Sequence, residues 1–335
     1  MLVRDLNAAL GQLLHEDPRV VVMGEDIADP YGGAFKVTRG LTDAIPERVF
    51  TTPVSEGAIV GVAAGLAMSG YRPIVEVMFA DFLTLTFDQV VNHVTKYPAM
   101  YDGKVTCPVI IRSPSGGHRG YGPTHSQSPE KHFLGVPNLL VVASSPYHDP
   151  LAVYRALLQR DDAVLFVEHK LLYPEPVSAP VAGRIGEALG REESSSGCLP
   201  TVALSWVPPE DCTVTLLAYG YTALIAARVL ERLAIEEEIF GELLVPAQIA
   251  PMDLGPVEAS VRRTRSLLTI EEGTAGWAWG TEIAQQIGHR QFGQLRRPVD
   301  VLASAATIIP SSREREELVL VSPADMRSRI REAAT

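Results

Sequence analysis

Residues 51–78 read TTPVSEGAIVGVAAGLAMSGYRPIVEVM, and this stretch decides the expected fold. Thr52 can cap a helix and Pro53 suits the first helical position, so the sequence predicts a helix that begins here, continues through small residues and ends at Gly70. The apolar run Pro73–Met78 then predicts a strand. A helix that leads directly into a strand is typical of an α/β fold.

The same alternation continues on both sides of this stretch. Leucines at helical spacing near the N-terminus predict a first helix. The other expected elements are strands at Arg19–Met23, Pro108–Arg112, Leu139–Ala143 and Val164–Glu168 and helices at Asp81–Tyr97 and Pro150–Gln159. Strands that are separated by helices form a parallel sheet covered by helices. Ligands of such sheets usually lie beyond the carboxyl ends of the strands.

The regular pattern stops near Tyr173 and resumes near Thr213. The residues between them are rich in Pro, Ser, Gly and Glu, which is typical of a connecting segment. We therefore expect a first domain over residues 1–175, an interdomain connection over residues 176–211, and a second, smaller α/β domain over residues 212–335. The expected elements of the second domain are strands at Thr213–Leu217, Ser266–Ile270 and Val299–Leu302 and helices at Ala223–Leu233 and Trp277–Ile287.

The composition narrows the range of partners. The chain carries 29 basic and 40 acidic side chains, a formal charge of −11, which repels nucleic acid and anionic membranes. Its three cysteines, Cys107, Cys198 and Cys212, lack a metal-binding spacing and do not suggest a disulfide framework. The N-terminus lacks an apolar signal core and no segment is long and apolar enough to span a bilayer, so we expect a cytoplasmic protein.

Three features invite a functional interpretation, although each also has a structural one. Glu56 lies in the first turn of the expected helix, where the helix dipole stabilises a carboxylate by about 0.3–1 kcal/mol. The polar loop after Arg112 contains His118 and His125; histidine suits proton transfer near neutral pH, but most loop histidines are solvated or hydrogen-bonded. Phe82 lies where a strand should turn into a helix, and an aromatic residue there more often belongs to the core.

Several enzyme signatures are absent from the sequence. It lacks GxGxxG, the P-loop lysine motif and GxSxG. It also lacks Gly-Asp-Gly followed by a distant Asn, the usual magnesium-diphosphate motif of thiamine enzymes. The chain is therefore not expected to hold a diphosphate group by itself.

Five blocks of sequence, in order and with matching spacing, closely resemble the β subunit of pyruvate and branched-chain 2-oxo acid dehydrogenases. They are Gly24–Asp26, Gly33–Leu41, Thr52–Gly61, Phe79–Asn92 and His125–Glu130. The resemblance covers roughly residues 3–175. The C-terminal half resembles the same family more loosely, most clearly at Glu271–Trp277.

In that family an α₂β₂ assembly binds thiamine diphosphate between subunits, and the resemblance implies the same arrangement here. The α subunit would hold Mg²⁺ and the diphosphate, and this chain would receive the aminopyrimidine ring. By motif, Glu56 would hydrogen-bond a ring nitrogen and so activate the cofactor, Phe82 would pack on the ring, and Val54 would make an apolar contact with it. His125 would face the reacting centre during acyl transfer to a lipoyl group.

The resemblance also implies a structural potassium ion held by backbone carbonyls near Leu157–Ala163. Asp162 matches a position where the family often has Asn or Asp, whereas Arg160 replaces a common Asp. Main-chain ligands tolerate such changes, so a K⁺ site near Leu157 and Asp162 is compatible with the sequence.

The C-terminal half departs from the family pattern in two places. At Val245–Asp253 an expected Arg is absent, and Pro246 removes an amide donor from the expected strand. At Ala306–Pro310 little of an Asp-x-Pro-x-Pro pattern remains. In the family this domain serves subunit packing and docking to an acyltransferase core. The expected carrier partner is therefore a lipoyl acyltransferase or another carrier.

Three functions fit these residues. The first is the β subunit of a 2-oxo acid dehydrogenase that decarboxylates its substrate and transfers the acyl unit to a lipoyl carrier. The second is a split transketolase-like subunit with another acceptor, because Gly122–His125 reads Gly-Pro-Thr-His as in transketolases; against it, Ser126–Glu130 follows the dehydrogenase pattern. The third, a silent scaffolding subunit, would be expected to lose Glu56 or His125, and both are present. The sequence favours the first function.

Overall fold

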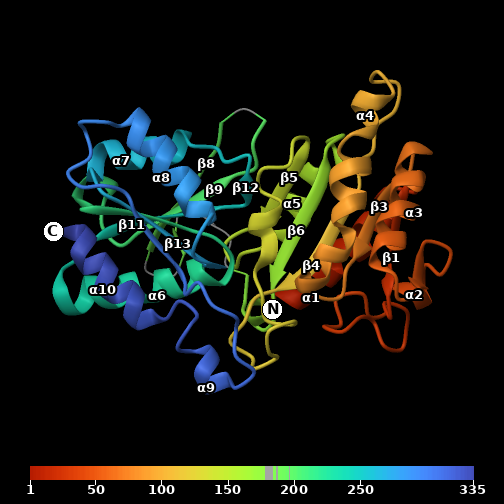
Figure 1. Cartoon of the computed structure of the whole chain (residues 1–335), viewed down its shortest axis with the longest axis horizontal. Helices are drawn as coiled ribbons and strands as arrows, with labels where there is room; N and C mark the ends of the chain where they lie inside the picture. The colour runs from red at the N-terminus through yellow and green to blue at the C-terminus, as the bar shows by residue number, and fades with distance from the viewer. Residues whose placement is uncertain (178–183, 186–187, 196) are drawn as a thin grey trace.

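The computed structural model describes residues 1–177, 184–185, 188–195 and 197–335, which form two helix-covered sheets next to each other along the long axis of the molecule (Figure 1). The α/β class predicted from the sequence is confirmed. None of the helices in the described residues is long and apolar enough to cross a membrane.

The first sheet has seven strands in the order β12-β5-β6-β4-β3-β1-β2. They are β1 (Val20–Glu25), β2 (Val49–Thr52), β3 (Arg72–Glu76), β4 (Ile110–Ser115), β5 (Leu139–Ala143), β6 (Ala163–His169) and β12 (Gln248–Ala250). All neighbours are parallel except β12, which is antiparallel to β5. Helices α1 (Leu2–Glu16) and α5 (Pro150–Leu158) bury their apolar side chains against one face, and α3 (Glu56–Met68) buries its own against the other.

The second sheet also has seven strands, in the order β14-β13-β10-β11-β9-β8-β7. They are β7 (Arg184–Ile185), β8 (Ala188–Glu193), β9 (Thr201–Ser205), β10 (Val214–Ala218), β11 (Gly241–Pro246), β13 (Leu267–Thr274) and β14 (Asp300–Ser304). Helices α6 (Gly220–Glu237) and α10 (Pro323–Ala334) cover one face. Helices α7 (Gly255–Thr264) and α8 (Trp279–Arg290) contribute to an apolar core that is continuous with the α3 side of the first sheet, so the two domains pack tightly together.

Shorter helices complete the fold. They are α2 (Leu41–Ala44), α4 (Tyr97–Met100), α9 (Arg313–Glu316), the 3₁₀ helices η1 (Ala80–Thr86), η3 (Pro129–His132), η4 (Lys170–Leu172) and η5 (Pro209–Asp211), and the π-helical segment η2 (Gln89–Val94).

The helix predicted to begin near Thr52 begins later. Thr52 ends β2 because this segment pairs in parallel with β1, and α3 starts at Glu56, preceded by Ser55. The far end agrees with the prediction: Gly70 follows the helix with φ 93°, in the left-handed region that glycine favours.

The segment Asp81–Tyr97, predicted as one long helix, is helical over most of its length but does not form a single regular α-helix. The segment is divided into η1, η2 and the start of α4. Threonine hydroxyls bond carbonyls inside it: Thr86 Oγ1 donates to Leu83 O (2.8 Å) and Thr95 Oγ1 to Val90 O (2.9 Å). Such bonds compete with the regular helical ladder, which the apolar pattern alone does not reveal.

The stretch predicted as an interdomain connection, residues 176–211, contains regular structure. Residues 178–183, 186–187 and 196 of this prediction lie outside the described residues. β8 and β9 pair antiparallel with each other, and β9 pairs with β11, so they extend the second sheet. The expectation of irregular backbone is therefore wrong for these two strands.

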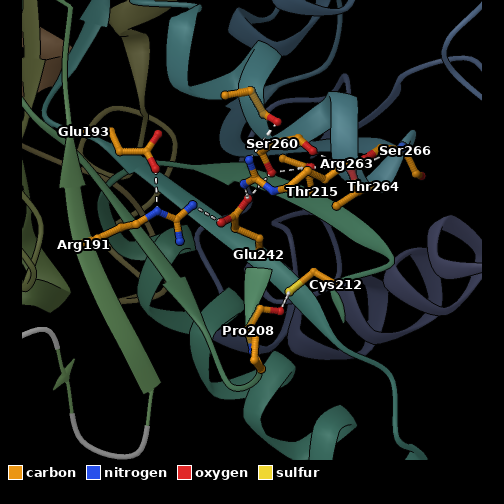
Figure 2. A network of polar contacts seen from close by, with 11 residues as sticks. Arg191, Glu193, Pro208, Cys212, Thr215, Glu242, Ser260, Arg263, Thr264 and Ser266 are labelled. Atoms are coloured by element: carbon orange, nitrogen blue, oxygen red, sulfur yellow. Dashed lines mark hydrogen bonds and ion pairs between the residues drawn. The ribbon is translucent and has the colours of Figure 1, made fainter. Parts of the chain in front are cut away.

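A buried carboxylate forms an ion pair between β8 and the rest of the second sheet (Figure 2). Glu242 of β11 is fully buried and pairs with Arg191 of β8 on one side. On the other side Arg263 of α7 donates from Nη2 to Glu242 Oε2 at 2.5 Å, and Ser260 donates to the same oxygen. Ser260 Oγ is in turn 2.7 Å from Thr215 Oγ1 of β10. The network joins four elements around one charge.

The chain crosses from the second sheet to the first directly after β11. That strand ends at Pro246, and Gln248 and Ala250 then pair with β5 of the first sheet. Pro246 has no N–H to donate, which a strand tolerates at its end. A short segment of the predicted second domain therefore belongs to the first sheet.

Replacing Glu242 by Gln should lower the free energy of unfolding of the assembled protein by about 2 kcal/mol. The amide would remove the counter-charge of Arg263 and one of the two carboxylates that pair with Arg191; the other, Glu193, would remain. Bonds to charged groups contribute roughly 1.5–3 kcal/mol each, but both arginines are partly exposed and can regain water. Urea unfolding measures the change. The matched control is E236Q, because Glu236 is an exposed partner of Arg327. This substitution should lower the free energy of unfolding by less than about 1 kcal/mol. Equal effects of the two variants would contradict the role of the network.

Candidate functional site

Four adjacent strands of the first sheet bring distant residues to one edge. β1 ends at Glu25, β3 is followed by Phe79, β4 leads into the loop after Ser115, and β6 leads into His169 and Lys170. Because these strands are parallel, their carboxyl ends meet at the same edge, where ligands of such sheets bind.

Glu56 is placed at the first position of α3 and only 7% of it is exposed. The buried Glu25 lies close enough for the two charges to interact, and Glu25 Oε1 has no hydrogen-bond partner among the described residues. Burial, followed by the negative charge of Glu56, raises the pKa of Glu25. Two carboxyl groups in a poorly hydrated place favour a ligand that offers hydrogen-bond donors or a basic nitrogen.

His125 and Phe82 are brought together by an aromatic cluster. The centroid of the His125 imidazole ring lies 4.7 Å from that of the Phe79 ring and 5.2 Å from that of the Phe82 ring. Both pairs have edge-to-face geometry. His125 Nδ1 is 3.0 Å from Thr124 Oγ1. The two phenylalanines therefore fix the plane of the ring from one side of the site.

Val54 and η1 flank the start of α3. Val54 is 77% exposed, two residues before Glu56. The segment η1, which carries Phe82, lies against α3: a Cβ at Gly57 would be 3.4 Å from the carbonyl oxygen of Leu85. The predicted residues Val54, Glu56 and Phe82 thus belong to two neighbouring segments, and Val54 is open for a ligand or a partner to cover.

Lys170 is a fully buried residue that sequence analysis missed. Its Nζ donates to the backbone carbonyl of His125 at 2.8 Å and lies 5.3 Å from the centre of the Phe79 ring. Burial lowers the pKa of Lys170 from 10.5 to about 8, although the charges of Asp81 and Glu272 oppose the change. Its position directly after the predicted strand Val164–Glu168 was the one signal in the sequence.

A carboxylate of the second domain also reaches this edge. Glu272 of β13 accepts hydrogen bonds from Gly117 N–H (2.7 Å) and from His169 Nε2 (2.9 Å). His118, for which sequence analysis favoured a structural role, lies 3.5 Å from the same carboxylate. The stretch Glu271–Trp277 carried only a loose resemblance to the family, so the sequence did not predict these contacts of Glu272.

The segment implied to hold potassium is a poor fit for a cation. Arg72 of β3 donates to the carbonyl oxygen of Arg160 (2.6 Å) and to Asp161 (3.0 Å). The Arg160 guanidinium itself pairs with Asp162 (2.8 Å). These two guanidinium groups repel an added cation, and they already bond the Arg160 carbonyl and the Asp162 carboxylate. Among the described residues, no group of three or more His, Cys, Asp or Glu side chains could hold a metal ion.

The chain matches two known domain families. Residues 4–176 match the transketolase pyrimidine-binding domain, and residues 207–326 match the transketolase C-terminal domain. Among solved structures it is similar to a split-gene transketolase, described as an inactive β4 tetramer, with a TM-score of 0.70 and 20% identity over 99% of this chain and 97% of that one. At this identity the similarity shows the fold alone.

Curated relatives match almost the whole chain. The pyruvate dehydrogenase E1 component subunit β-1 of Arabidopsis thaliana is 35% identical over 322 residues, 96% of this chain and 85% of the relative. The 3-methyl-2-oxobutanoate dehydrogenase subunit β of Mycobacterium tuberculosis is 33% identical and covers 96% and 88% of the two chains. The β subunit of the acetoin:2,6-dichlorophenolindophenol oxidoreductase of Cupriavidus necator is 31% identical and covers 96% and 93%.

A pyrimidine-binding domain followed by a transketolase C-terminal domain defines a protein of the transketolase class. Within that class, the chain belongs to the family of β subunits of 2-oxo acid dehydrogenases. This family depends on thiamine diphosphate, and the residues at the start of α3 fit its aminopyrimidine ring. Glu56 and Glu25 are buried carboxyl groups that could bond the ring nitrogens, and the aromatic Phe82 and the exposed Val54 could offer the ring apolar surface.

Replacing Lys170 by Met should stabilise the fold while lowering activity. The ammonium of Lys170 holds its proton less tightly in the folded protein than in the unfolded chain. The charged Lys170 therefore lowers the free energy of unfolding by on the order of 3 kcal/mol below pH 8, and this loss disappears as the pH rises toward 10.5. K170M should therefore raise the free energy of unfolding at pH 7 by about 2 kcal/mol and remove its rise between pH 8 and 10.5. Turnover should fall about tenfold or more, because the His125 carbonyl loses its donor.

The control for this variant is Lys104→Met, at an exposed lysine, which should change neither quantity. Urea unfolding across the pH range and steady-state kinetics provide the two measurements. A K170M protein that is less stable and fully active would contradict the prediction.

Proposed function

We propose that this chain is the β half of an enzyme that decarboxylates a 2-oxo acid oxidatively and passes the acyl unit to a lipoyl carrier. An α subunit would complete the site in an α₂β₂ assembly and hold Mg²⁺ with the diphosphate, since this sequence lacks the Gly-Asp-Gly motif. The observation that carries the proposal is the buried Glu56 at the start of α3, at the sheet edge where His125 and Phe82 also lie. Named relatives act on pyruvate and on 3-methyl-2-oxobutanoate, which supports this substrate class.

Glu56 would hold and transfer a proton at the aminopyrimidine ring. When bound, thiamine diphosphate supplies the carbon nucleophile and the electron sink for decarboxylation. Glu56 Oε would hydrogen-bond a ring nitrogen, and the buried Glu25 lies beside it, with a pKa raised by burial and by the charge of Glu56. Water must be excluded for this hydrogen bond to be strong, and a closed interface with the α subunit would exclude it.

His125 would act at the reacting centre, because its imidazole can donate or accept a proton near neutral pH. The edge-to-face contacts with Phe79 and Phe82 restrict its rotation, and Lys170 fixes its backbone. Positioning of this kind matters because a misplacement of about 1 Å can cost roughly a hundredfold in rate. The α subunit would supply much of the remaining pocket and so much of the choice among 2-oxo acids.

A split transketolase-like activity is the second candidate. Its support is the sequence Gly122–His125 and the similarity of fold to a split-gene transketolase. The dehydrogenase proposal has stronger support, because relatives of 31–35% identity that cover nearly the whole chain are dehydrogenase or acetoin oxidoreductase β subunits. The two candidates differ in the acceptor of the transferred unit.

The variant Glu56→Gln should reduce turnover by about 10²–10⁴-fold, because the amide cannot take part in proton transfer to the ring. The variant should still assemble with the α subunit, since the amide occupies nearly the same volume. Glu47→Gln is the control at an exposed carboxylate and should retain full activity. Turnover of E56Q at the level of E47Q would refute the role proposed for Glu56.

The reaction class is tested by release of CO₂ from pyruvate and from branched-chain 2-oxo acids. The chain is purified with its natural partner, supplied with Mg²⁺ and thiamine diphosphate, and given an artificial electron acceptor in place of the lipoyl carrier. Release from one acid is expected, and it would identify the substrate. No release from any acid, by a complex shown to bind the cofactor, would favour the transketolase-like activity instead.

A further inference from the structure

The loop after β4, residues 116–128, carries His125 and is held from outside its own domain; we refer to it as the His125 loop. Glu272 of β13, in the second domain, is buried beneath it. Glu272 Oε1 accepts a hydrogen bond from Gly117 N–H at 2.7 Å and another from the Ser128 hydroxyl at 3.1 Å. One oxygen of the second domain therefore binds both the beginning and the end of the loop.

The other oxygen of Glu272 faces histidines of the first domain. His169 Nε2 lies at 2.9 Å, and its Nδ1 accepts the N–H of Leu171 at 3.2 Å, so Nε2 carries the hydrogen that points to Glu272. His118 of the His125 loop lies at 3.5 Å. Burial opposes a charge on Glu272, but His169, His118 and the Gly117 N–H outweigh it and lower the pKa of Glu272 to about 2. The carboxylate is charged at neutral pH.

A second buried carboxylate of the same domain holds the middle of the loop. Glu316 of α9 accepts the N–H of Gly120 at 2.6 Å. The loop also lies directly against this segment: a Cβ at Gly117 would be 2.4 Å from Leu320 Cδ1 and 3.0 Å from Glu316 Oε1. A side chain at this position would require Leu320 to move, so the loop and the second domain are in direct contact here.

The first domain holds the opposite side of the loop. Lys170 donates to the carbonyl of His125, and Asp81 Oδ1 accepts from the side chain of Gln127 (2.8 Å) and from its backbone N–H (3.2 Å). His125 thus lies on a segment without regular secondary structure that is held by charged groups from both domains. If the contacts from one domain were lost, the backbone that carries the His125 imidazole would be free to shift.

We propose that Glu272, assisted by Glu316, is a positioning residue that fixes the His125 loop, so that the second domain acts on the catalytic histidine in addition to packing between subunits. The consequence for catalysis rests on the function proposed above for His125. The ordering of the loop by Glu272 does not depend on that function, and the experiment separates the two.

The test compares Glu272→Gln with a matched control in the complete α₂β₂ complex with thiamine diphosphate and Mg²⁺. The amide of E272Q keeps the shape of the side chain but removes the charge that the histidines and amides bind. The control is Glu282→Gln, because Glu282 is an exposed carboxylate of α8 whose side chain accepts from Gln286. The variant Glu272→Asp keeps the charge on a shorter side chain and should recover part of the activity.

For E272Q we expect kcat for acyl transfer to a lipoyl domain to fall by about tenfold or more, while KM for the 2-oxo acid changes by less than about threefold. Hydrogen exchange of the backbone amides in residues 117–128 should accelerate by about tenfold or more, whereas amides of β5 should keep their rates. E282Q should alter none of these quantities. A general loss of stability would instead accelerate exchange in both regions.

Ser128→Ala tests the same contact from the loop side and remains useful if E272Q does not assemble. Its effect on kcat should be smaller, and the double variant should lose less than the two single losses multiplied, because both act through one contact. The proposal would be overturned if E272Q or S128A left both kcat and hydrogen exchange of the loop unchanged in an active complex. It would also be overturned if the losses of kcat in the two single variants simply multiplied in the double variant. If the wild-type complex turns over no 2-oxo acid, the proposed function fails, and the exchange rates alone still decide whether Glu272 orders the loop.

Discussion

The buried guanidinium of Arg112 is the constraint on which the first sheet depends. It lies on the central strand β4, between Glu76 of β3 and Glu168 of β6, and Arg112 Nε is 2.9 Å from Glu168 Oε1. Tyr173 donates to Glu168 at 2.9 Å, so the remaining oxygen is also satisfied. A buried ion is tolerated only when it is paired and fully hydrogen-bonded. A slip of one residue in any of these strands would break the network, so the register of all three is fixed.

The fixed register determines where the site can be built, but it does not place the site residues by itself. His169 is the last residue of β6, and Phe79 and Lys170 follow within a few residues of their strands, so the sheet places all three directly. His125 lies ten residues beyond β4, on a loop that strand geometry no longer controls. Its position therefore depends on charged side chains that reach it from elsewhere, Lys170 from one domain and Glu272 from the other. Functional loops are commonly held in this way by a rigid scaffold.

The sequence predicted what local pattern controls and failed where distant contacts decide. β5 (Leu139–Ala143) agrees residue by residue with the prediction because both of its faces are buried. β8 has the composition of a linker, but it pairs with β9, and its Arg191 also pairs with Glu242, 51 residues away. The candidate site divides in the same manner. Glu56, Phe82 and His125 were predicted from motifs, whereas Glu272 was not predicted, because its contact with the loop spans 155 residues.

The difference between backbone contacts and side-chain contacts explains why the second domain can depart from the family sequence after Pro246 but not at Glu271 and Glu272. At the crossing after Pro246, the backbone makes a contact with the first sheet: Ala143 N–H donates to Ala247 O at 2.9 Å, and this bond does not require a particular polar side chain. At Glu271 and Glu272 the side chains themselves make the contacts. Glu271 accepts from Gly280 N–H at the start of α8, although burial raises its pKa to about 7, and its neighbour holds the His125 loop. Divergence at the crossing is therefore compatible with an intact contact between Glu272 and the His125 loop.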